Sequence, residues 1–306
     1  MSRNNQASRD YYNHKLANHY TDYPVRRPCE LLQFLMEDGP RLNRSKAKQL
    51  LSYKMVFVDN VIVTQFNAPL SKGQLVRISQ RGNQHVLNSP FVSIVYEDAF
   101  LLVVDKSVGI LTNTQPGMRD NSVKRILDEY VKRERRAYSV HTVHRLDRVT
   151  SGLLIFAKRR DVQEAFMNNW HNYVYDRRYV ALTEGRMERD HGTVESWLSD
   201  NRMFLTYSSP TDNGGKFAVT HYVTLQRGKE YSLVELRLET GRKNQIRVHM
   251  QDIGHPIAGD QKYGAQTDPL GRVCLHAYRL EFRHPITGEN LQFNMPVPPQ
   301  FQTLLQ

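Results

Sequence analysis

The segment 141–158 constrains the fold of this chain more than any other part of the sequence. Its second half is a short, uninterrupted apolar run, Leu153–Ala157, which the chain enters through a glycine. An apolar run of this length bounded by glycine is typical of a strand buried on both faces. Just before it, a carboxylate, Asp147, stands between Arg145 and Arg148. We therefore expect an acid flanked by guanidinium groups on a loop held by a core strand, where catalytic residues often lie.

Short apolar runs recur along residues 90–306, with few helical patterns between them. Strands are predicted over the ranges 93–96, 101–104, 179–183, 221–225, 233–239 and 274–282. Helices are predicted over 123–136, 161–170 and 244–253, the last because apolar residues recur on one of its sides. Strands interleaved with a few helices favour an α+β fold, with a mixed, mainly antiparallel β-sheet and flanking helices. We assign residues 90–306 to one large domain.

Residues 29–82 carry the pattern of a smaller, separate module. A short helix is predicted at 31–35, and Asn43 is placed to cap a second helix over 44–51. Two strand-like runs, 56–58 and 61–63, then flank Asp59-Asn60, which is a two-residue hairpin signal. The module is therefore predicted to pack two helices against a hairpin.

This order of elements resembles the S4 RNA-binding domain, a small α/β domain, although Lys54 stands where that domain usually has a glycine. Basic side chains of the second helix would then face RNA phosphates: Arg44 and Lys48, with Arg41 and Lys46 beside them. A solvated helix face is the alternative for each of these residues. Residues 1–28 are predicted to form a polar tail that docks loosely or stays mobile, and residues 83–90 a linker.

The charge balance favours a polyanionic partner. The chain has 42 Lys and Arg against 31 Asp and Glu, a net charge of +11, and phosphates are contacted by these cations. A merely soluble basic protein is the alternative. Cys29 and Cys274 form neither a disulfide framework nor a zinc spacing, which indicates a reducing compartment. Without a secretion signal or an apolar run of membrane-spanning length, we expect a soluble, cytoplasmic monomer that does not bind membranes.

The segment 144–152, His-Arg-Leu-Asp-Arg-Val-Thr-Ser-Gly, closely resembles the signature of the RluA-type pseudouridine synthases. Further segments resemble motifs of this family and follow in its order: 98–109, 178–181, 241–249, 254–264 and 275–277. The chain departs from the family at residues 105–107, where Asn-Lys-Pro is usual, and at Lys243-Asn244, where Thr-His is usual. The resemblance implies that residues 90–306 isomerise specific uridines of RNA, with large-subunit ribosomal RNA favoured and transfer RNA next.

The resemblance also implies roles for individual residues. Asp147 would be the nucleophile, since a carboxylate can bond covalently to a sugar carbon or a pyrimidine carbon, and both sites of attack remain open. Arg247 would hold this carboxylate, bidentately, and keep it ionised. Tyr179 would lie against the uracil face and share a proton through its hydroxyl. Leu275 would form an apolar wall.

Two residues before the acid, Arg145 would help to displace the target base from its stack, which makes RNA loops and bulges the preferred targets. His144 would orient the loop through a hydrogen bond. The isomerisation neither oxidises nor transfers a group to a second molecule, so it requires no cofactor. Outside this motif, an Asp paired with a neighbouring Arg, a core Tyr or Leu and a surface Arg would be the ordinary interpretations.

Two other functions are open to a chain of this kind. A non-catalytic RNA-binding protein of ribosome assembly would not need Asp147, Tyr179 and Arg247 together, and their joint presence favours the enzyme. A metal-dependent hydrolase is suggested by the spacing of His141, His144 and Asp147. However, the Thr-Ser-Gly that follows predicts a loop instead of a helix, and no further ligands cluster nearby. We therefore expect no metal.

Overall fold

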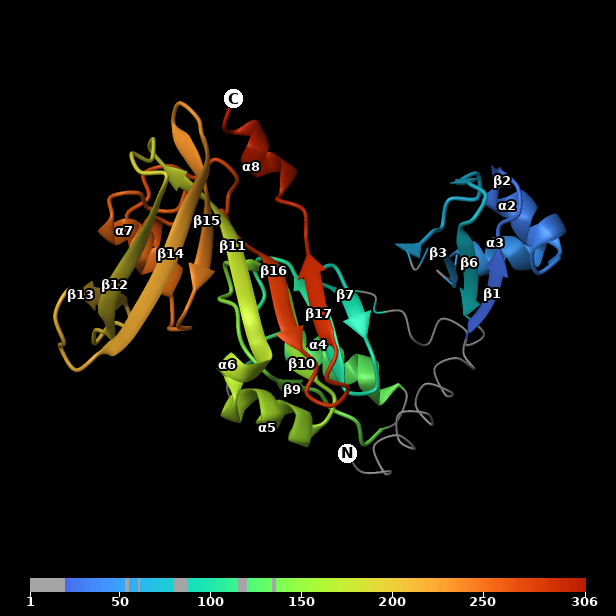
Figure 1. Cartoon of the computed structure of the whole chain (residues 1–306), viewed down its shortest axis with the longest axis horizontal. Helices are drawn as coiled ribbons and strands as arrows, with labels where there is room; N and C mark the ends of the chain where they lie inside the picture. Colours follow the sequence, from blue (N-terminus) through green and yellow to red (C-terminus); the bar gives the residue numbers. More distant parts are fainter. Residues whose placement is uncertain are drawn as a thin grey trace. The chain divides into compact units, whose positions relative to one another are not determined.

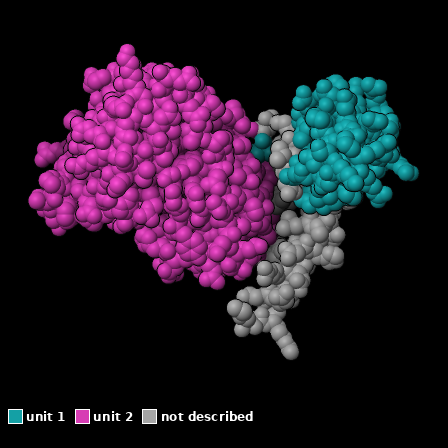
Figure 2. All heavy atoms as spheres, turned by 45° about the horizontal axis from the view of Figure 1, so that its top comes forward, with its two compact units in different colours: residues 1–87 teal, residues 88–306 magenta. Residues whose placement is uncertain are grey.

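The computed structural model of this protein describes residues 20–52, 55–59, 61–79, 87, 89–114, 120–133 and 136–306. The chain divides into two compact units, residues 1–87 and residues 88–306, which Figure 2 colours teal and magenta. Lys54, the first 19 residues of the predicted tail and most of the predicted linker lie outside the described residues.

Unit 1 is a small sheet with helices packed against it (Figure 1). The four-stranded sheet has the order β1 (Tyr20–Pro24), β6 (Leu75–Ser79), β3 (Val56–Val58) and β4 (Val61–Ile62). A short pair, β2 (Cys29–Glu30) with β5 (Pro69–Leu70), lies beside it. The helical segments are α2 (Leu31–Gln33), a π-helical turn over Phe34–Asp38, and α3 (Arg44–Ser52). Apolar side chains from all these helices and from β3 and β6 form one core.

Two local predictions for unit 1 are confirmed and one is wrong. The Asn43 side chain accepts a hydrogen bond from the Lys46 amide at 2.8 Å and so caps α3, and β3 pairs with β4 across the predicted hairpin. Residues 20–25, assigned to the tail from their polarity, instead belong to the folded unit. Strand β1 pairs antiparallel with β6, and Val25 is buried in the core.

Unit 2 is built on one long sheet of 11 strands. Its main path runs in the order β13 (Thr206–Ser209), β12 (His191–Asp200), β14 (Lys216–Arg227), β15 (Tyr231–Leu238), β11 (Val174–Glu184), β16 (Leu275–Arg283), β10 (Ser151–Ala157), β8 (Leu101–Lys106) and β7 (Val92–Glu97). Off this path, β17 (Asn290–Asn294) pairs with β16, and β9 (His141–Thr142) pairs with β10. Among these pairings only β10 with β16 is parallel, so the predicted α+β fold with a mixed, mainly antiparallel sheet is confirmed.

The helices of unit 2 gather at two places on this sheet. Helix α7 (Gln245–Asp252) packs against β12, β13 and β14 and is followed by a 3-10 turn over Gln261–Tyr263. Helices α5 (Arg160–Asn168) and α6 (Trp170–Tyr173) lie by the lower ends of β10 and β11 in Figure 1, near α4 (Val123–Lys132). The last helix, α8 (Pro299–Thr303), ends the chain. The central strands β11 and β16 therefore separate the α7 region from the α4 to α6 region.

Strand β10 is buried along its whole length, as its apolar run predicts. Gly152 lets β10 lie close to β16, its parallel neighbour: Gly152 has a φ of +115°, and a Cβ atom there would lie 2.1 Å from the carbonyl oxygen of Ala277. Only glycine combines this backbone conformation with so close a contact. The contact fixes the loop that precedes β10 beside the first residues of β16.

Candidate active site

One cleft of unit 2, with a volume of about 680 Å³, brings together side chains that are far apart in the sequence. Its lining includes all the site residues that the sequence analysis names in this unit: Arg145, His144, Asp147, Tyr179, Arg247 and Leu275. They come from the loop before β10, from β11, from α7 and from β16. The two remaining candidates, Arg44 and Lys48, are exposed on α3 of unit 1.

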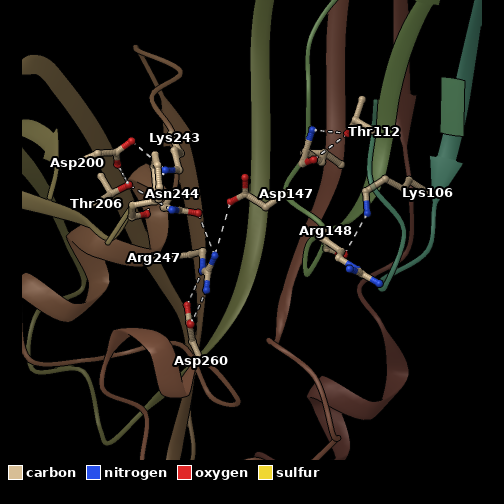
Figure 3. A network of polar contacts seen from close by, with 12 residues as sticks. Lys106, Thr112, Asp147, Arg148, Asp200, Thr206, Lys243, Asn244, Arg247 and Asp260 are labelled. Atoms are coloured by element: carbon tan, nitrogen blue, oxygen red, sulfur yellow. Dashed lines mark hydrogen bonds and ion pairs between the residues drawn. The ribbon is translucent and has the colours of Figure 1, made fainter. Parts of the chain in front are cut away.

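The loop that carries Asp147 is fixed by hydrogen bonds on both sides of this residue (Figure 3). On one side, the Thr112 hydroxyl donates to the Leu146 carbonyl at 2.8 Å and accepts from the Leu146 amide at 3.1 Å. On the other side, the Gly109 amide donates to the Arg148 carbonyl at 2.8 Å, and the Arg148 Nε donates to the Gly109 carbonyl at 2.9 Å. The side chain of Asp147, 23% exposed, is thus held at the cleft by its backbone.

Lys106 also binds this loop, through the backbone carbonyl of Arg148. Its ammonium group is fully buried and donates to the carbonyl oxygens of Ser107 at 2.9 Å, Ile110 at 3.0 Å and Arg148 at 3.4 Å. Burial lowers the pKa of Lys106 to about 8 from its ordinary value of 10.5, although the charge of Asp147 opposes this. A buried cation without a paired carboxylate is costly, and carbonyl dipoles compensate part of that cost.

This lowered pKa predicts an unusual dependence of stability on pH. Between about pH 8 and 10.5 the unfolded chain still holds a proton that the folded chain has released from Lys106. The free energy of unfolding should therefore rise with pH across this window, by about 3 kcal/mol, and this gain is lost as the pH falls from 10.5 through 8. Urea denaturation of the protein and of Lys106→Met at several pH values tests this. The difference in free energy of unfolding between the two proteins should rise with pH across this window. A difference that does not change with pH contradicts the prediction.

Arg247 is placed differently from the sequence expectation, which paired it bidentately with Asp147. Its Nε and Nη2 atoms each donate to Asp260 at 2.7 Å, so the bidentate partner is Asp260. Its Nη1 donates to Asn244 Oδ1 at 2.9 Å and lies 3.9 Å from Asp147 Oδ2 (Figure 3). The ring of Tyr263 lies 4.7 Å from the guanidinium carbon. The predicted ion pair of Arg247 with Asp147 is therefore present, but it is not bidentate, because Asp260, only 1% exposed, has the greater need of a buried cation.

The electrostatics keep Arg247 charged. Burial by itself would lower the pKa of Arg247, but the hydrogen bonds and the charge of Asp260 outweigh burial, and the pKa is raised. Asp260 is hydrogen-bonded to Arg247, whereas Asp147 lies 3.9 Å from the guanidinium and makes no direct hydrogen bond to it. The oxygens of Asp147 are therefore open to the cleft.

Tyr179 and Leu275 form apolar surface in this cleft. Tyr179 on β11 is opposite Ala277 of β16, two residues beyond Leu275, and both side chains are buried. Burial raises the pKa of Tyr179, and the charge of Asp147 adds to this rise while Arg177 opposes it. The phenol is therefore neutral near pH 7, which suits a ring packed beside a carboxylate.

His144 acts as a neutral support. Its Nε2 accepts a hydrogen bond from the Ile155 amide of β10 at 3.1 Å, and its ring packs edge-on against Trp170. Burial lowers the pKa of His144 to about 3, and the charge of Arg177 acts in the same direction. The hydrogen bond thus orients the segment before Asp147 against the core strand, and the imidazole carries no charge at neutral pH.

Sequence reasoning missed several residues of the cleft. Arg177 lies over the ring of Trp170 at 4.8 Å, and both line the cleft together with Arg242. Strand alternation could have found Arg177, because residues two apart on a strand share a face and Tyr179 was already assigned. With the exposed Arg145, these guanidinium groups give the cleft a cationic lining suited to phosphates.

Among the residues that the structure describes, no group of three or more His, Cys, Asp or Glu side chains is arranged to hold a metal ion. No helix in the described ranges has the length and hydropathy needed to cross a membrane.

The family model, the related sequences and the solved structures that match this chain all point to the same family. Residues 100–252 match the family model described as RNA pseudouridylate synthase. The chain is 37% identical over 281 residues to an uncharacterized RNA pseudouridine synthase, YlyB, of Bacillus subtilis, covering 90% of this chain and 92% of that protein. It is 31% identical over 287 residues to the ribosomal large subunit pseudouridine synthase D of Nitrosomonas europaea, covering 90% and 83%. The solved structure of human RNA pseudouridylate synthase domain containing 1 aligns with a TM-score of 0.55 and 25% identity, covering 69% of this chain and 86% of that one.

Proposed function

Because this chain belongs to the RNA pseudouridylate synthase family, and to its RluA type, we propose that it isomerises uridines of large-subunit ribosomal RNA with Asp147 as the nucleophile. That it is an RNA pseudouridine synthase, an isomerase, follows from the family. The observation that carries the proposed role of Asp147 is its position: an accessible carboxylate in a cationic cleft, 3.9 Å from a buried guanidinium that forms its tight ion pair elsewhere.

The reaction breaks the bond between ribose C1′ and uracil N1 and forms a bond between C1′ and C5. The hydrogen on C5 is released as a proton and N1 gains one, so the composition of the nucleoside does not change. In our proposal an oxygen of Asp147 bonds transiently to the nucleoside, at C1′ or at a carbon of the ring, and leaves when the new bond is complete. No redox step and no second substrate are involved.

The other cleft residues retain and orient the base. Tyr179 supplies a flat, neutral face on which detached uracil can turn, and Leu275 closes the apolar side. Arg247 keeps a positive charge facing Asp147 throughout. Arg145, exposed at the cleft and without an ion-pair partner in the described part of the chain, is available to displace the target base or to hold its phosphate.

The proposed RNA substrate is inferred from the names of related proteins. Several, including that of Nitrosomonas europaea, are named for the large ribosomal subunit, and we propose the same substrate here, with transfer RNA as the second candidate. We further propose that unit 1 is an S4-like RNA-binding domain in which the exposed Arg44 and Lys48 of α3 contact phosphates. The free cysteines, Cys29 and Cys274, suit a reducing cytoplasm.

One assay tests the function. The purified protein is mixed with ribosomal RNA transcribed without modification, and with a transfer RNA transcript in parallel, and pseudouridines are then mapped by position. We expect a small number of modified sites in the large-subunit RNA. Modification confined to transfer RNA would overturn the substrate proposal, and binding without any modification would favour the non-catalytic RNA-binding alternative.

The net charge of +11 predicts strong salt dependence of RNA binding. If about 6 to 10 phosphates are contacted, affinity should fall roughly 10³- to 10⁵-fold between about 50 and 200 mM salt, because bound counterions are released on binding. Filter binding across a salt series measures the slope. Arg44→Gln together with Lys48→Gln should make the slope shallower by about two contacts. A flat response to salt in the unmodified protein contradicts a phosphate-contacting role for its basic side chains.

A further inference from the structure

Lys243 and Asn244, one of the two places where the sequence differs from the motifs it resembles, belong to a polar network that ends at Arg247 (Figure 3). Asn244 precedes α7, is buried, and adopts a left-handed backbone with a φ of +53°. Asparagine at this position commonly caps a helix through its side chain. Here the side chain makes no capping hydrogen bond. Both of its polar atoms are used elsewhere.

The side-chain oxygen of Asn244 accepts a hydrogen bond from Arg247 Nη1 at 2.9 Å. The orientation of the amide follows from chemistry, because a guanidinium only donates and must face the oxygen. Nη1 is also the nitrogen that lies 3.9 Å from Asp147. Asp260 restrains the opposite side of the guanidinium. Asn244 therefore restrains the one guanidinium nitrogen that faces the proposed nucleophile.

The amide is itself held by two further residues. Its Nδ2 donates to the Thr206 hydroxyl at 3.3 Å, and that hydroxyl donates to Asp200 Oδ1 at 2.6 Å. Asp200 is in turn paired with Lys243, whose ammonium lies 2.8 Å from Oδ2. Since the hydroxyl proton is given to Asp200, the Thr206 oxygen is left as an acceptor for Asn244. Lys243 and Asn244 are thus held by the end of β12 and the start of β13.

We propose that Asn244 is a positioning residue, which holds Arg247 Nη1 at a fixed distance from Asp147 and is itself aimed by Thr206. The proposal rests on Asp147 being the nucleophile. The charge of Arg247 stabilises the ionised acid, while the hydrogen bond of Nη1 goes to the amide. Without that amide, Nη1 is free to close on Asp147 and occupy an oxygen needed for attack.

Asn244→Gly tests this directly, because glycine keeps the left-handed backbone and removes only the amide. The single-turnover rate of pseudouridine formation should fall about 10- to 100-fold, the loss expected from a small misplacement of a catalytic group. The dissociation constant for RNA should stay near that of the parent protein, and the melting temperature should fall by only a few degrees, because two buried hydrogen bonds are lost. A matched control is Asn213→Gly, an asparagine in the exposed turn between β13 and β14. An unchanged rate for Asn244→Gly would overturn the proposal.

Thr206→Val separates positioning from a general structural role. In the parent background it should lower the rate, whereas in the Asn244→Gly background it should have no further effect, because its target is gone. Equal effects in both backgrounds would count against the proposal. A crystal structure of Asn244→Gly decides the geometry without reference to activity: Arg247 Nη1 should move toward Asp147 by more than about 0.5 Å. An unmoved guanidinium refutes the inference, while an inactive parent protein would count only against the proposed function.

Discussion

Replacing Asp147 with alanine is expected to abolish pseudouridine formation, with a loss of at least about 10⁴-fold, while RNA binding persists. The reason is that the carboxylate is the proposed covalent partner of the nucleoside. Among the described residues, Glu239 is the only other acid that lines the cleft. Arg247 remains neutralised by Asp260, so the change leaves no buried unpaired charge. Stability should change little.

The measurement is single-turnover pseudouridine mapping, combined with filter binding and thermal denaturation. Asp147→Asn keeps the shape of the side chain and removes its charge, and it should be equally inactive. Asp212→Ala, in the exposed turn after β13, serves as the control for loss of an aspartate. Product formation at the parent rate by Asp147→Ala would remove the assignment of the nucleophile.

Replacing Arg247 with methionine is expected to cost about 3–5 kcal/mol of stability as well as activity, because Asp260 is then left charged in a buried site. Combining it with Asp260→Asn should recover roughly 2 kcal/mol or more, since the uncompensated charge is removed. Activity should not return, because the guanidinium 3.9 Å from Asp147 is absent from the double variant. Stability and catalysis are thereby separated at one residue.

Urea denaturation followed by tryptophan fluorescence suits this experiment, because both tryptophans, Trp170 and Trp197, lie in unit 2. The signal therefore reports the unit that contains Arg247, and unfolding of unit 1 does not confuse it. A double variant as unstable as Arg247→Met alone would show that Asp260 is not the source of the loss. Full stability of Arg247→Met would contradict the buried pairing itself.

The part of the site that could be predicted from sequence is local. The run Leu153–Ala157 predicts a buried strand, and β10 is one. The polar residues that precede this run predict a loop, and Asp147 lies on that loop next to the strand. Likewise, Asn43 and the hairpin of unit 1 act within a few residues of one another. Interactions of this range are encoded by neighbouring side chains, so pattern reasoning reaches them.

What could not be predicted depends on pairings across the fold. Arg247 pairs with Asp260 because the turn before the 3-10 segment places Asp260 against α7. No local sequence pattern around Asp260 indicates this partner. Strand β12 was missed because one of its faces is mostly open to solvent and it has no continuous apolar run. Strand β1 was assigned to a tail since its place depends on β6, which follows 50 residues later in the chain. Each of these is decided by tertiary contact and overrides local propensity.

The close parallel pairing of β10 and β16 at Gly152 has a consequence for the binding of RNA. The nucleophile loop continues directly into Gly152, and Leu275 lies two residues before Ala277, the residue whose backbone Gly152 touches. These two walls are joined main chain to main chain, so one cannot shift without the other. An incoming RNA strand therefore meets a wall in which the Asp147 loop and Leu275 keep a fixed spacing.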